Sequence, residues 1–132
     1  MFGNVSYNNG YIYLDVLKEQ PENNEFDEFV ATSEKLYMTM NKPFILALNL
    51  HKMGILGPSE VIKWMAMFFR VIAITEKYLS YTIVHLNKSL KDSVTLFLNL
   101  YNPVKPFHVF YSQESFSQAI NFANSNNVEN KS

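Results

Sequence analysis

The feature that most constrains the fold is the run FILALNL at residues 44–50, which is apolar at almost every position. A strand with one face in water alternates apolar and polar residues, whereas a strand inside a parallel sheet is covered on both faces and stays apolar. The run therefore predicts a central strand of a parallel sheet. Residues 81–86 (YTIVHL) and 107–111 (FHVFY) are further short runs whose composition favours strands.

Helical spacing fills the segments between and after these strands. The first helix is expected to begin at the acidic residues that precede Phe26, because acidic side chains favour a helix start. It is expected to end near Met40, because Pro43 disfavours helical geometry in the residue before it. A second helix is expected over 59–79, where Pro58 suits a helix start. Two more are expected from Leu90 to Tyr101 and after Ser112. Alternation of this kind predicts a largely parallel sheet with right-handed crossovers.

The beginning of the chain favours an antiparallel pair. Residues 2–7 and 11–17 flank Asn8-Asn9-Gly10, and Asn and Gly tolerate the positive φ angles of tight hairpin turns. The complete prediction is an α/β fold: an N-terminal β-hairpin, a mixed and mostly parallel sheet of about five strands, and four helices.

Composition limits the organisation and the function. The chain has 132 residues, 48% of them hydrophobic, which suits one domain over 1–123 followed by a polar tail at 124–132 that we expect to be flexible. The net charge of −1, with dispersed basic residues, argues against nucleic-acid binding. The absence of cysteine excludes disulfides and thiolate chemistry. We expect no membrane span, because charges interrupt the longest apolar stretch, and we expect a cytoplasmic location.

No catalytic or metal-binding pattern is recognisable. The chain contains no nucleophile elbow and no glycine-rich phosphate loop. His51 follows the predicted strand 44–50 and His85 lies near the end of the predicted strand 81–86, so the two could approach each other. His108 lies near the start of its predicted strand and therefore at the opposite edge of the sheet. A zinc site would need a third ligand beside the first two. We therefore expect no enzyme activity, no metal and no cofactor.

The order of elements resembles the STAS domain, which anti-sigma-factor antagonists share with the cytoplasmic tails of sulfate transporters. Three passages carry this resemblance: FILALNLHKMGIL, GPSEVIKWM and KPFHVFYSQESFSQAI. It covers the chain from about Phe2 to Ala123. It implies a protein-binding regulatory module, and it aligns Ser59 with a serine that antagonists expose for phosphorylation. The alternative for Ser59 is a structural role in the first turn of its helix.

The helix predicted over 59–79 is apolar around an unusually large part of its circumference. Lys63, Arg70 and Lys77 form one polar stripe. The face opposite this stripe is expected to turn inward and contains Val61, Met65, Phe68, Ile72 and Leu79. The remaining apolar residues form a flank: Trp64, Met67, Val71, Ile74 and Tyr78. Either neighbouring elements cover this flank or it binds a partner, since such residue types are enriched at interface cores.

The first functional hypothesis is a non-catalytic interaction module that binds a protein partner or a second copy of itself. Its expected surface combines the 49–59 loop with the flank of the following helix. The expected contact residues are Asn49, His51, Gly57, Pro58, Ser59, Trp64, Met67, Val71, Ile74 and Tyr78. The alternative is a small-ligand or lipid-binding α/β domain. A cavity among the helices would favour the alternative, and a solid core with an exposed aromatic flank would favour the first hypothesis.

Overall fold

A computed structural model of the protein describes residues 1–101 and 105–121. Five strands form one sheet in the order β1-β2-β3-β4-β5. Their bounds are β1 Gly3–Asn8, β2 Tyr11–Val16, β3 Phe44–Leu50, β4 Leu79–Leu86 and β5 Phe107–Phe110. The first two strands are antiparallel and all other pairs are parallel. The predicted α/β class, with a hairpin and a mixed sheet of five strands, is confirmed.

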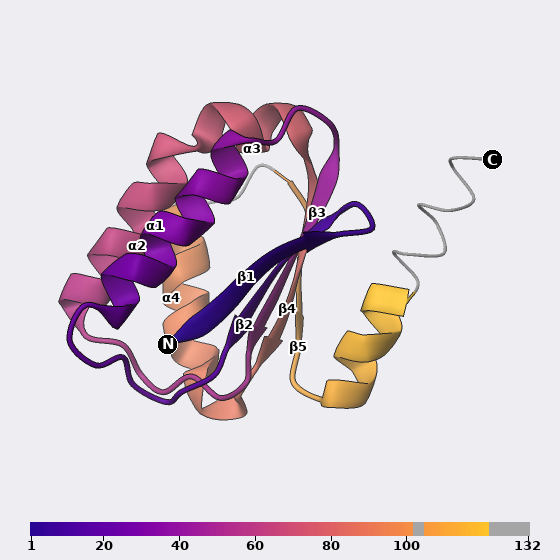
Figure 1. The fold of residues 1–132 in the computed structure, drawn as a ribbon. Coiled ribbons are helices and arrows are strands. Elements are labelled where there is room, and N and C mark those ends of the chain that lie inside the picture. The colour runs from indigo at the N-terminus through magenta and orange to yellow at the C-terminus, as the bar shows by residue number, and fades with distance from the viewer. Residues whose placement is uncertain (102–104, 122–132) are drawn as a thin grey trace.

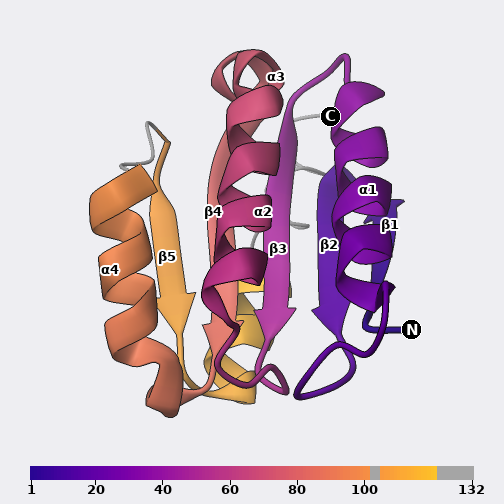
Figure 2. The same cartoon turned by 90° about the vertical axis from the view of Figure 1, so that its left-hand side faces the viewer.

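The helices cover the two faces of the sheet unequally. They are α1 Glu25–Met38, α2 Pro58–Arg70, α3 Ile72–Tyr78, the 3-10 turn η1 Lys88–Leu90, α4 Lys91–Tyr101, and a last helix at 113–121. Figure 1 shows α1 to α4 on one side of the sheet and the last helix alone on the other. In Figure 2, α4, α2 and α1 run side by side in front of the strands.

The prediction of a single helix over 59–79 is wrong, because α2 ends at Arg70 and α3 begins at Ile72. Val71 lies between them with φ −100° and ψ 12°, outside helical geometry. A straight helix over 58–78 would be about 31 Å long, whereas strands of six to eight residues span about 20–26 Å. The break lets the chain bend over the end of the sheet, and it gives one helix more than expected. The tail predicted at 124–132 lies outside the described residues.

The hairpin turn has the predicted chemistry. Asn9 and Gly10 adopt φ angles of 52° and 88°, and Asn8 pairs with Tyr11 across the turn. Two consecutive positive φ angles are typical of the type I′ turn, whose twist matches that of the strands. The turn therefore sets the register of the hairpin, which places Ile12, Leu14 and Val16 together in the main core.

Two cores lie on the two faces of the sheet. The larger core, under α1 to α4, contains the predicted inward residues of the first helix, among them Phe26, Phe29 and Tyr37. The smaller core consists of Ala47, Ile83 and Phe116, with Phe116 coming from the last helix. The helix-rich face therefore holds most of the buried apolar surface.

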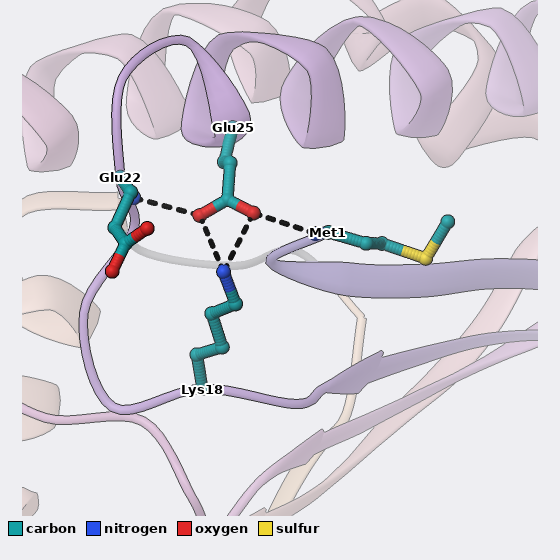
Figure 3. A network of polar contacts seen from close by, with 4 residues as sticks. All are labelled: Met1, Lys18, Glu22 and Glu25. Atoms are coloured by element: carbon teal, nitrogen blue, oxygen red, sulfur yellow. Dashed lines mark hydrogen bonds and ion pairs between the residues drawn. The ribbon is translucent and has the colours of Figure 1, made fainter.

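A polar network fixes the start of the chain to α1. Glu25 accepts hydrogen bonds from the Lys18 ammonium group and from the backbone NH of Glu22, both at 2.8 Å, and pairs with the Met1 amino group at 2.6 Å (Figure 3). These contacts lower the pKa of Glu25 to about 2, with the Lys18 hydrogen bond as the largest cause. The network joins both ends of the hairpin to the first turn of α1.

Candidate functional site: an apolar pocket between α2 and α4

A pocket of about 200 Å³ lies over the sheet, with α2 and α3 on one side and α4 on the other. Its floor comes from the sheet and includes Leu46, Leu48, Val84 and Phe107. One wall comes from α2 and α3 and includes Trp64, Phe68 and Ile72. Phe26 and Phe29 of α1 also line the pocket, next to Trp64. The opposite wall comes from η1 and α4 and includes Leu90, Ser93 and Val94. Figure 2 shows α2 and α4 standing apart over the strands that form this floor.

The loop at 51–57 closes the end of the pocket next to the carboxyl ends of the strands, where Met53, Ile55 and Leu56 line it. This loop is tied to the segment after β2 by two hydrogen bonds. The NH of Gly54 donates to the carbonyl of Glu19 at 2.8 Å, and the Gln20 side chain donates to the carbonyl of Ile55 at 2.9 Å. The closure of the pocket is therefore built from two loops that are distant in sequence.

The other end of the pocket carries the charges. Among the described residues that line it, only Glu76 and Lys105 are charged. Glu76 belongs to α3, shortly before β4, and Lys105 precedes β5, so both lie at the amino-terminal edge of the parallel strands. The buried hydroxyl residues Thr75 and Thr82 line the pocket near them. The pocket is thus polar at one end and apolar along most of its length.

Trp64, the single tryptophan of the chain, forms part of the wall. Its ring stacks on Phe29 with centroids 5.6 Å apart and an interplanar angle of 8°. The rings of Trp64 and Phe68 are nearly perpendicular, with centroids 5.3 Å apart. The side chain is half-buried. A molecule that entered the pocket would displace water from beside this indole.

The prediction that this flank of five residues contacts a partner is wrong for two of them. Met67 and Val71 are 0% exposed and belong to the main core. Trp64, Ile74 and Tyr78 are half-buried and pack against the same core. Helices α2 and α3 turn inward through residues 64, 67, 68, 71 and 75. Conversely, Val61 and Ile72, which were expected to turn inward, are each 37% exposed at the rim of the pocket.

The residues of the 49–59 loop that were predicted to form one binding surface lie on opposite sides of the sheet. Asn49 and His51 belong to the sheet face under the last helix, since Asn49 alternates with the core residue Leu48 along β3. Gly57, Pro58 and Ser59 lie at the start of α2, on the other side. Pro58 and Ser59 are exposed. The structure therefore does not bring the predicted contact residues together into one surface.

Asn49 and the two histidines form a polar chain on that second face. The Asn49 side-chain NH donates to the Tyr13 hydroxyl at 3.3 Å, and its carbonyl lies 3.1 Å from Nδ1 of His85. The His51 ring stacks on His85 with centroids 4.6 Å apart. An amide carbonyl only accepts, so this contact requires a proton on Nδ1 of His85. The expected approach of His51 to His85 is confirmed, and His108 instead contacts Tyr81.

This histidine pair does not form a metal site. The two rings are nearly parallel, at 4°, so their nitrogen lone pairs lie in parallel planes and do not converge on one point. Across the described parts of the chain, no group of three or more histidine or acidic side chains could hold a metal ion. Burial lowers the pKa of His85, and the charge of His51 lowers it further.

No sequence pattern predicted the pocket or its polar end. Glu76 and Lys105 carry no motif and belong to segments that are far apart along the chain. The one local signal is Thr82, a hydroxyl residue on the pocket side of a strand that is otherwise apolar there. No sequence pattern indicates how far apart α2 and α4 stand.

Comparisons with known proteins give no match: no protein-family model matches the chain, and no curated protein or solved structure matches it. The STAS resemblance thus stays a prediction. In the part of the chain that the structure describes, no helix has both the length and the apolar character needed to cross a bilayer.

Proposed function

We propose that this protein is a non-catalytic binding domain that takes a small apolar ligand between α2 and α4. The observation that carries the proposal is the pocket itself, whose described lining is apolar apart from a few residues, most of them at one end. Ligand pockets typically combine an apolar lining with a few polar groups that orient the ligand. The proposal adopts the alternative functional hypothesis from the sequence, for which a cavity among the helices is the expected sign.

The size of the pocket supports a ligand rather than a packing defect. Protein interiors contain few voids larger than a water molecule. Val61 and Ile72 are exposed at the rim of the pocket, so the pocket opens to solvent and a ligand can enter it. Since an apolar cavity of about 150 Å³ accommodates benzene, this pocket suits a ligand portion of about eight non-hydrogen atoms.

The test uses the neutral probe 1-octanol and the fluorescence of Trp64. We expect saturable binding that changes the tryptophan emission, confirmed by isothermal titration calorimetry. Each methylene that enters an apolar site contributes about 0.8 kcal/mol, so 1-octanol should bind about 15-fold more tightly than 1-hexanol.

A matched pair of variants in α4 locates the site. Val94 lines the pocket, whereas its neighbour Thr95 is exposed and does not. Val94→Phe fills the space and should weaken 1-octanol binding at least tenfold, and Thr95→Phe should leave it unchanged. Both variants are first checked for folding by circular dichroism. The absence of saturable binding by the wild-type protein, or an equal effect of both variants, would contradict the proposal.

A second candidate function is self-association, favoured by exposed apolar side chains on the outer face of α2. Ile62 is 66% exposed and Phe69 is 53% exposed, one heptad apart. The net charge of −1 offers little electrostatic resistance to association. This candidate keeps the hypothesis that the protein binds a partner or itself, but its contact residues are the exposed Ile62 and Phe69 instead of the buried Met67 and Val71. The regulatory STAS-like role and phosphorylation of the exposed Ser59 stay predictions within it.

Light scattering with mass determination tests this candidate. A dimeric wild-type protein that becomes a folded monomer on Ile62→Glu, but not on Thr95→Glu, supports it. A wild-type protein that is monomeric at high concentration rules it out, and it leaves ligand binding as the sole proposal.

A further inference from the structure

We infer that the ligand is an amphipathic carboxylate with a medium-length apolar chain, bound with the carboxylate at Lys105 and the chain directed toward the 51–57 loop. This inference rests on the proposed function and names the class of ligand. The two ends of the pocket differ, since its charged lining residues lie at one end only.

The polar end is built by the strands rather than by a freely placed loop. The NH of Thr82 donates to the carbonyl of Pro106 at 2.9 Å, and Thr82 pairs with Phe107 in the β4–β5 ladder. These contacts hold the backbone next to Lys105 against β4. The Thr82 side chain points into the pocket beside this junction, where it can donate a hydrogen bond.

The opposite end is uncharged and mostly apolar. Leu50, Met53 and Leu90 line it next to the carboxyl ends of the strands. Leu46, which pairs with Thr82, and Leu50 both line the pocket, and β3 rises about 13 Å between them. The pocket therefore has the length for an extended chain that starts at the polar end, and its volume limits that chain to about eight atoms.

The charge of Lys105 selects the polar group of the ligand. Lys105 is half-buried, and among residues 1–101 and 105–121 none of the ion pairs includes it. A half-buried lysine covers apolar surface with its methylene stem and keeps its ammonium group accessible, so the ammonium group of Lys105 can meet a ligand group of opposite charge at this end of the pocket. Glu76 lines the same end but is exposed, so water screens its charge more strongly. A ligand carboxylate would compensate Lys105 by a charge-assisted hydrogen bond.

The experiment compares three probes of equal chain length by isothermal titration calorimetry: octanoate, 1-octanol and octylamine. Hydrogen bonds to charged groups contribute roughly 1.5–3 kcal/mol, so octanoate should bind about 10- to 150-fold more tightly than 1-octanol. Lys105→Met should bring the ratio of the two affinities close to one, and Lys105→Arg should restore most of it. Lys91→Met, an exposed lysine of α4 outside the pocket lining, should keep the wild-type ratio.

The possible outcomes separate the two claims. If 1-octanol binds but octanoate has no advantage, or if the advantage survives in Lys105→Met, the carboxylate inference is wrong and the apolar pocket stands. A preference for octylamine also overturns it and assigns the selection to Glu76. If none of the three probes binds the wild-type protein, the proposed function itself fails. Lys105→Gln also removes the charge, and it replaces Lys105→Met in the comparison where Lys105→Met does not fold.

Discussion

At the scale of single residues, His85 is the least ordinary side chain of the fold. It is 1% exposed, its Nδ1 contacts Asn49, and its Nε2 has no partner within the described residues. The ring lies between His51 and Phe116, whose centroids are 4.6 and 5.3 Å away. A neutral ring with its proton on Nδ1 fits these surroundings, because a proton on Nε2 would be a buried donor without an acceptor.

We predict that this histidine makes the protein less stable in mild acid. The pKa of His85 is lowered from 6.5 in the folded state, mainly by burial. The unfolded chain therefore takes up a proton first as the pH falls. The stabilising contribution is complete above pH 6.5 and decreases as the pH drops through 6.5 toward the lowered pKa. Each unit of difference between the two pKa values corresponds to about 1.4 kcal/mol.

Urea unfolding at several pH values between 8 and 5 measures this effect. His85→Gln should flatten the dependence of the unfolding free energy on pH, whereas the same change at the exposed His108 should not. His51→Gln should reduce the dependence without removing it, because burial is the larger cause. Equal slopes for the wild-type protein and His85→Gln would show that another group titrates.

At the scale of elements, the orientation of α2 decides which of its many apolar residues are structural. Met67 and Phe68 are buried against the sheet, and Trp64 packs beside them on the ring of Phe29. Ile62 faces outward. The break at Val71 then turns α3 so that Thr75 also faces inward, where its hydroxyl donates to the carbonyl of Ile72 at 3.1 Å. The two short helices thus keep one continuous buried stripe.

This orientation predicts unequal effects of truncation along α2. Met67→Ala should lower the free energy of unfolding by about 2–5 kcal/mol, because it removes a fully buried side chain and leaves a cavity. Ile62→Ala should change it by less than about 0.5 kcal/mol, because the side chain is already in water. Urea unfolding curves compare the two directly. Similar losses for both variants would mean that α2 is rotated relative to this structure.

At the scale of the whole molecule, the Glu25 network holds together segments that the sheet does not join. It links the start of β1, the segment after β2 and the first turn of α1 (Figure 3). Phe2, next to the Met1 amino group in this network, contacts both Phe26 and Phe29 edge to face. Phe2, Phe26 and Phe29 also line the pocket. The network therefore supports one side of the proposed binding site.

The network predicts a loss of stability in strong acid. Its contacts lower the pKa of Glu25 from 4.5 to about 2. The contribution of Glu25 is present above about pH 4.5 and is lost as the pH falls toward 2, because the unfolded chain binds the proton first. Glu25→Gln should weaken the pH dependence of thermal unfolding between pH 5 and 2.5. Glu28→Gln, an exposed carboxylate in the same helix, serves as the control.

Sequence alone determined the features that depend on neighbouring residues. Asn9-Gly10 predicts its own turn because few residues accept positive φ angles. The apolar run 44–50 predicts a doubly covered strand, and the spacing from Phe26 to Tyr37 predicts the buried face of α1. Each of these signals is local, since the period of side-chain direction is two in a strand and 3.6 in a helix.

Only the tertiary structure decided the orientation of α2 and the existence of the pocket. Residues 61–72 are apolar at most positions, so their spacing fits several buried faces, and contact with the sheet and α1 selects the one centred on Met67. The pocket depends on the distance between α2 and α4, and Lys105 reaches its edge through the β4–β5 pairing. Spaces between elements have no period along the chain, because segments far apart in sequence create them.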